Sequence, residues 1–199
     1  MISTLFLTQL QILINDAMTE FSAPDYLPAL PEIFLGGISL ILLTIGVFVG
    51  NRITTLLTWV TSLVLIAAVV IVLSLNINDQ ITFGGLYIAD TFGTFMKCLV
   101  LIGGAITLIM GMSYVKNEGM KRFEFPILIL FATTGMLLMI SANDLISLYV
   151  GLEMQSLALY IVAAFKRESI RSTESGLKYF VLGALSSGLL LYGATLVYG

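Results

Sequence analysis

Long apolar blocks, separated by short polar stretches, fill the sequence from about residue 32 to its last residue. Six such blocks lie at about 32–50, 53–75, 91–115, 125–141, 143–165 and 174–198. A helix of about 20 apolar residues crosses the hydrocarbon core of a bilayer, and each block is close to this length. The blocks lack the alternation of apolar and polar positions that a membrane barrel requires. The pattern therefore predicts an all-α integral membrane fold, with about six transmembrane helices in a domain that covers residues 31–199.

The first 30 residues follow a different pattern. Their apolar run, ISTLFLTQLQILI, has about 13 residues, which is too few to cross the bilayer. Asp16 and Glu20 follow this run, and three prolines then interrupt any helix before the first block: Pro24, Pro28 and Pro31. We expect residues 1–30 to form an extension at the membrane interface or under lipid, with a further partial span as the alternative.

Composition agrees with a membrane protein, because 58% of the 199 residues are hydrophobic and only 11% are charged. The chain has one cysteine, Cys98, and no histidine, which excludes a disulfide framework and argues against thiolate or imidazole metal sites. No phosphate-binding glycine loop or nucleophile elbow is present either. We therefore expect no cofactor and no complete active site in this chain.

The charged residues predict the orientation of the helices. Seven of the nine basic residues lie in the connections after the first, third and fifth blocks: Arg52, Lys116, Lys121, Arg122, Lys166, Arg167 and Arg171. The other segments carry acidic residues: Asp16, Glu20, Asp25, Glu32, Asp79, Asp90 and Asp144. The positive-inside rule places the basic connections in the cytoplasm or matrix and both termini on the outer side. No basic residue precedes Arg52, so the positive segment of a secretory signal or a mitochondrial presequence is missing.

Three ionisable side chains lie well inside the predicted spans: Lys97, Glu153 and Lys178. Glu153 lies about ten residues into its helix, and its side chain is too short to reach either surface, so burial there needs a reason. It either holds two helices together or forms, with Lys178, a coupled acid and base that relays protons. Lys178 has the alternative of pairing locally with Glu174 or reaching back to the inner surface. Lys97 either extends to the outer interface or acts as a functional lysine or a partner for a neighbouring subunit.

Small and hydroxyl residues gather on the third and sixth spans. Close helix packing and hydroxyl bonds between helices are the ordinary explanation. The alternative is that three serines hold water between the ionisable groups, which makes them possible accessory residues: Ser156, Ser186 and Ser187.

These residues also resemble a known family. The segments SLYVGLEMQSLALYIVAAF and ESGLKYFVLGALSSGLLLYGATLVYG are similar to the fifth and sixth spans of subunit 2 of the mitochondrial NADH dehydrogenase, called subunit N in bacterial complex I. LPEIF at the first block and RFEFP before the fourth resemble the same family. The similarity runs from about Leu30 to the last residue.

The resemblance implies an antiporter-like subunit in the membrane arm of the proton-pumping NADH:quinone oxidoreductase, of about fourteen helices in two inverted repeats. It assigns proton translocation to Glu153 and Lys178, whose positions match the family's glutamate in the fifth span and lysine in the sixth. NADH, FMN, iron–sulfur clusters and quinone are expected in other subunits, and the other membrane-arm subunits and lipids are the expected partners. The membrane is expected to be the mitochondrial inner membrane or a bacterial plasma membrane.

The family's further lysines, on its seventh, eighth and twelfth helices, would follow Gly199. We therefore expect a separate chain to carry the C-terminal helices, with a truncated chain as the alternative. Two other functions stay open. A multisubunit cation/proton antiporter uses the same combination of glutamate and lysine, and a structural half-subunit would brace the arm without its own proton path.

Overall fold

The computed structural model describes residues 25–75, 80–118 and 122–198. Most of them form six long helices: α2 (Leu30–Val49), α3 (Thr54–Ser74), α4 (Thr91–Asn117), α5 (Glu124–Ser141), α6 (Leu145–Ala163) and α7 (Ile170–Tyr198). The prediction of an all-α membrane fold is confirmed. The helix bounds depart from the predicted ranges by at most four residues, at the start of α7, which begins at Ile170 and not at Glu174. The part of residues 1–30 before Asp25 lies outside the described residues.

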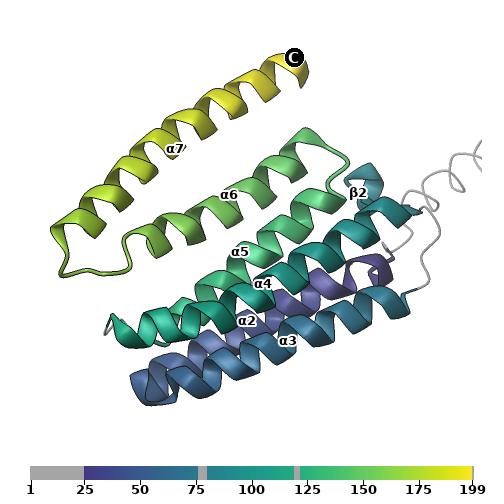
Figure 1. Cartoon of the computed structure of the whole chain (residues 1–199). Coiled ribbons are helices and arrows are strands. Elements are labelled where there is room, and N and C mark those ends of the chain that lie inside the picture. The colour runs from purple at the N-terminus through teal and green to yellow at the C-terminus, as the bar shows by residue number, and fades with distance from the viewer. Residues whose placement is uncertain (1–24, 76–79, 119–121, 199) are drawn as a thin grey trace, which may run out of the picture.

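Five helical stretches of the described residues are long and apolar enough to cross a membrane. The first of them, Leu27–Ser74, contains both α2 and α3. The chain reverses between these helices at the 3-10 turn η2 (Gly50–Ile53), where Gly50 has a φ of +72°, a value that favours glycine. Figure 1 shows α2 and α3 as two separate helices side by side, so the stretch supplies two spans and not one.

Helices α2, α3, α4 and α6 pack around α5 (Figure 1). α5 contacts α2, α3, α4 and α6, and its buried residues include Ile127, Leu130 and Leu137. α7 packs against α6 and is largely exposed, with Gly176 and Ser187 as its buried residues. The described chain thus has a well-packed bundle from α2 to α6, to which α7 is attached on one side.

Hydroxyl side chains inside this core bond to their own helices. Thr58, Thr61, Thr133 and Thr134 each donate a hydrogen bond of 2.7–2.9 Å to the carbonyl four residues earlier. Such bonds satisfy a polar group where no water is available. These residues therefore need no functional explanation for their burial.

A short hairpin, absent from the sequence-based interpretation, closes one end of the bundle. Strands β1 (Gln80–Thr82) and β2 (Tyr87–Ala89) are antiparallel and are joined through η3 (Phe83–Gly85). The backbone N–H of Asn143 donates to the carbonyl of Leu86 at 3.0 Å, and its side-chain amide donates to the carbonyl of Gly85 at 2.8 Å. The hairpin is therefore fixed to the connection between α5 and α6.

The connections at the opposite end carry the basic residues. The ammonium of Lys166, after α6, lies 2.7 Å from the carboxylate of Glu118, after α4, and both side chains are exposed. The hydrogen bond and charge of Glu118 raise the pKa of Lys166. Figure 1 shows the α4–α5 and α6–α7 connections at the same end, as the sequence predicts for the basic side, although Lys121 lies outside the described residues.

Candidate functional site

Glu153 brings a carboxylate into the middle of α6. Its Oε1 atom is buried and has no hydrogen-bond partner among the described residues. Spacings of four and seven residues place Glu153 on the same helix face as Tyr149 and Tyr160, which contact α7. A buried carboxylate oxygen without a partner is unfavourable, so it requires water, a proton or a group beyond the described residues.

Lys178 does not reach this carboxylate. Its ammonium lies 2.6 Å from Glu174 Oε1 one turn earlier in α7, and both side chains are largely exposed. The structure thus brings Lys178 to Glu174, the local pairing left open by the sequence, and not to Glu153. The role of Glu153 and Lys178 in proton translocation stays a prediction.

The three serines differ in their surroundings. The Ser187 hydroxyl is buried and shares a hydrogen bond of 3.0 Å with the Tyr149 hydroxyl, which links α6 and α7. Ser156 is half-buried and lies on the Glu153 face, three residues further along α6. Ser186 is exposed. Only Ser156 and Ser187 therefore lie where either could join a network that includes Glu153.

The second cluster of charge lies at the hairpin end and contains Lys97. Its ammonium lies 2.7 Å from Glu32 Oε1, and the two side chains are 6% and 4% exposed. Glu32 comes from the first turn of α2, whereas Lys97 comes from the second turn of α4. Of the alternatives for Lys97, extension to the outer interface is wrong, because the side chain points into the bundle and contacts a carboxylate there.

Glu32 is the site residue that sequence reasoning missed. The sequence places it among the acids of the outer segments, because it lies near the end of an apolar block. The structure corrects this placement, since residue Glu32 is only 5% exposed. A spacing argument gave no link between Glu32 and Lys97, which are far apart in the sequence. The one signal for Glu32 in the sequence is Lys97 itself, because a buried ammonium group needs a counter-charge.

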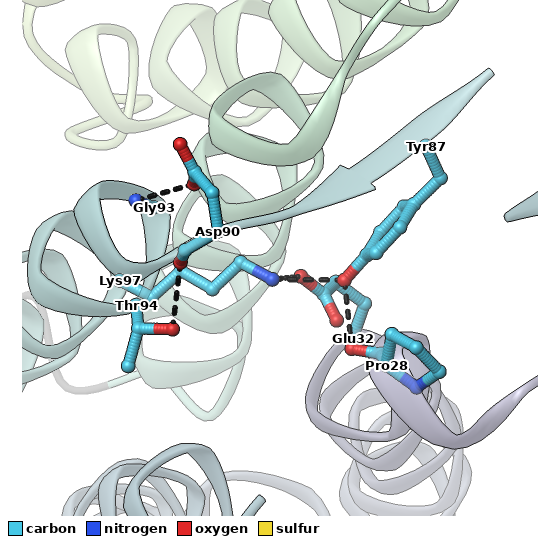
Figure 2. Close-up of polar contacts among 7 residues, drawn as sticks. All are labelled: Pro28, Glu32, Tyr87, Asp90, Gly93, Thr94 and Lys97. Carbon is cyan, nitrogen blue, oxygen red and sulfur yellow. Dashed lines mark hydrogen bonds and ion pairs between the residues drawn. The ribbon is translucent and has the colours of Figure 1, made fainter. Parts of the chain in front are cut away.

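Tyr87 of β2 completes the cluster (Figure 2). Its hydroxyl accepts a hydrogen bond of 2.8 Å from Lys97 and donates one of 2.8 Å to the carbonyl of Pro28. Burial, together with the charge of Glu32, raises the pKa of Tyr87 far above its ordinary value, so the phenol keeps its proton. The hairpin, α2 and α4 thus meet at one hydrogen-bonded centre.

We expect replacement of Tyr87 by phenylalanine to destabilise this end of the bundle by about 1–3 kcal/mol, because the Pro28 carbonyl loses its donor and Lys97 loses an acceptor. The measurement is the thermal inactivation midpoint of the membrane complex that contains the chain. Tyr192→Phe, at an exposed tyrosine of α7, is the matched control. Equal midpoints for the two variants would contradict the expected role of the hydroxyl.

Two hollows flank the cluster. A small cavity of about 10 Å³ is lined by Lys97, Asp90, Thr94 and Ser141, among others. A groove of about 600 Å³ runs on the other side and includes Glu32 and Tyr87 in its otherwise mostly apolar lining. Lys97 therefore lines a small cavity of mixed polarity, and Glu32 lines a mostly apolar groove.

The relatives found by comparison with known proteins carry the same subunit name. A family model described as "NADH:quinone oxidoreductase/Mrp antiporter, TM" matches residues 142–199, which include Glu153 and Lys178. A protein of Rhodospirillum rubrum called NADH-quinone oxidoreductase subunit N is 56% identical over 174 residues. The protein of the same name in Parvibaculum lavamentivorans is 51% identical over 182 residues, and the one in Rhodobacter capsulatus is 50% identical over 171 residues.

These alignments cover 86%, 89% and 85% of the chain. They cover 36%, 37% and 36% of the three relatives, so the chain spans little more than a third of the length of the proteins it matches.

Proposed function

Since the chain is homologous over most of its length to subunit N of NADH-quinone oxidoreductases, which confirms the resemblance seen in its sequence, we propose that it acts as an antiporter-like membrane-arm subunit of such an enzyme. In this role it contributes to proton translocation, while electron transfer from NADH through FMN and iron–sulfur clusters to quinone takes place in other subunits. Its partners are the other membrane-arm subunits and the surrounding lipids.

One observation in the structure carries the proposal. The carboxylate of Glu153 lies in the middle of a membrane-spanning helix, with an oxygen that no described residue satisfies. Such a group changes its protonation state when the charge or hydration around it changes, and intramembrane carboxylates of this kind mark proton routes. Lys178, Ser156 and Ser187 act as further members of the route when segments beyond the described residues complete it.

The membrane proposed for this activity is an energy-transducing one, either a mitochondrial inner membrane or a bacterial plasma membrane. The basic connections at one end of the bundle support an orientation with that end in the matrix or cytoplasm. The hairpin and both termini then face the outer side. A separate chain carrying the C-terminal helices stays a prediction, which the masses of the intact subunits test.

Glu153→Gln tests the function in the assembled complex, reconstituted in vesicles. We expect fewer protons per electron, with NADH oxidation retained after an uncoupler is added, because glutamine keeps the shape of the side chain and cannot ionise. Glu168→Gln, the same change at an exposed loop residue, should leave the proton yield unchanged.

A normal proton yield in an assembled Glu153→Gln complex would oppose the proposal. It would favour the structural alternative, in which the subunit braces the arm and its neighbours pump.

The second candidate is a subunit of a multisubunit cation/proton antiporter, because the matching family includes such an antiporter beside the oxidoreductase. Isolation of the native complex distinguishes the two. Co-purification with NADH:quinone activity supports the oxidoreductase, whereas sodium/proton exchange without NADH-oxidising subunits supports the antiporter.

A further inference from the structure

Glu32 and Lys97 form a charged pair that the proposed route through Glu153 does not use. Both residues are only 5% exposed, and they are held by contacts among α2, α4 and β2. A buried ion pair contributes little more to stability than apolar residues of the same volume, so stability alone is a weak explanation for placing it here.

Three buried oxygens at the pair have no hydrogen-bond partner among the described residues. They are the two carboxylate oxygens of Glu32, of which Oε1 forms the ion pair with Lys97, and the hydroxyl of Ser141, whose residue is only 1% exposed. Buried polar atoms without a protein partner are commonly satisfied by ordered water. The cavity of about 10 Å³ between Lys97 and Ser141 has the volume that one water molecule needs.

The same cavity extends toward the surface at the hairpin end. Asp90 lines it, is partly exposed, and caps α4 by accepting the Gly93 N–H at 2.7 Å (Figure 2). Thr94, also in the lining, donates its hydroxyl to the Asp90 carbonyl at 2.9 Å. Asp90 and Thr94 thus place polar groups in the cavity lining between the outer end of α4 and Lys97.

We propose that Glu32 and Lys97 form a second proton-binding site, loaded from the outer side through one water molecule held by Lys97 and Ser141. Lys97 first passes one of its protons to Glu32 Oε1, 2.7 Å away, and the neutral amine then takes a proton from a hydronium in the cavity. The products are water, an unchanged ammonium and a neutral carboxylic acid, so the site gains one proton and one positive charge. Tyr87 positions Lys97, and its hydroxyl keeps its own proton, which it donates in a hydrogen bond to the Pro28 carbonyl.

The inference rests on the proposed function for its role in turnover, but the binding of water and of a proton is measured separately. A high-resolution map of the native complex should contain a water within hydrogen-bond distance of Lys97 Nζ and Ser141 Oγ. Infrared difference spectra between acidic and neutral pH should contain a carboxylic-acid carbonyl band that is lost in Glu32→Gln. A cavity without water, or spectra that Glu32→Gln leaves unchanged, would overturn the site.

Turnover is tested in reconstituted complex with Glu32→Gln, and with Glu168→Gln as the control for the same chemical change. We expect Glu32→Gln to lower the number of protons per electron without lowering uncoupled NADH oxidation. A merely structural role predicts less assembled complex at an unchanged yield. If the Glu32→Gln complex does not assemble, the proton yield of Ser141→Val tests the proposal instead, because valine fills the cavity and both charged groups stay. A normal yield in Ser141→Val then overturns the inference.

The two proposals fail in different ways. A lower proton yield in Glu153→Gln but not in Glu32→Gln or Ser141→Val leaves the proposed function standing and ends the second site's role in turnover. A complex that oxidises no NADH ends the proposed function, whereas the bound water and the infrared band still decide the binding site.

Discussion

Lys97→Met is expected to cost about 3–5 kcal/mol of stability, because it leaves the Glu32 carboxylate buried without its counter-charge. Tyr87 cannot replace the lysine, since its hydroxyl already donates to the Pro28 carbonyl. We therefore expect little assembled complex and a clearly lower thermal inactivation midpoint. Quantitative native electrophoresis and the midpoint of the remaining complex measure the two effects.

The double variant Glu32→Gln/Lys97→Met separates the missing charge from the missing volume. It removes both charges and keeps side chains of similar size, so most of the lost stability should return. Lys178→Met is the matched single control, because the Lys178–Glu174 pair is largely exposed and such pairs contribute only about 0–1 kcal/mol. Equal losses in Lys97→Met and Lys178→Met would show that the buried pair is not the source of the effect.

Gly135→Ala should be the second damaging change, because α5 and α6 meet there backbone to backbone. A Cβ atom on Gly135 would lie 2.6 Å from the backbone nitrogen of Gln155 and 2.8 Å from the backbone carbonyl oxygen of Gly151. Neither atom is the end of a flexible side chain, so the helices must separate, and overpacking of this kind costs about 1–3 kcal/mol or more. The loss should be visible as a lower inactivation midpoint and a lower yield of assembled complex.

Gly103→Ala is the control for this change. Beyond its chain neighbours and the nearby backbone of its own helix, no described atom lies within 4 Å of a Cβ atom built on Gly103, and alanine has the higher helix propensity. We expect a neutral or slightly stabilising effect there. If Gly135→Ala behaves in the same way, the close approach of α5 and α6 is not what the structure indicates.

The helices could be predicted from the sequence because their cause is local. An apolar stretch of about 20 residues must satisfy its own backbone in the membrane, and a helix does so within the segment. The hairpin between α3 and α4 has no such local cause. Its strands are three residues long, and it is held by bonds from Asn143 to the carbonyls of Gly85 and Leu86, which only the folded chain brings together.

The candidate site residues also divide into those with a local cause in the sequence and those that only the folded chain brings together. Glu153 could be singled out because its depth follows from its position within one helix. The partner of Lys97 could not, because the burial of Glu32 depends on the packing of α2 against other elements and on the hairpin that brings Tyr87 to the pair. The local bond between Lys178 and Glu174 was available as an alternative, since it needs only the spacing of one helical turn.

The different depths of the two carboxylates have a consequence for the membrane voltage. Glu153 lies near the middle of the 19-residue α6, whereas Glu32 lies in the first turn of α2. A proton that reaches Glu153 from the outer side crosses about half of the voltage, which changes its free energy by about 1.2 kcal/mol for every 100 mV. A proton that reaches Glu32 crosses almost none. Under the two proposals, proton occupancy at Glu153 should therefore depend on the membrane voltage, whereas proton occupancy at Glu32 should depend on the pH of the outer phase.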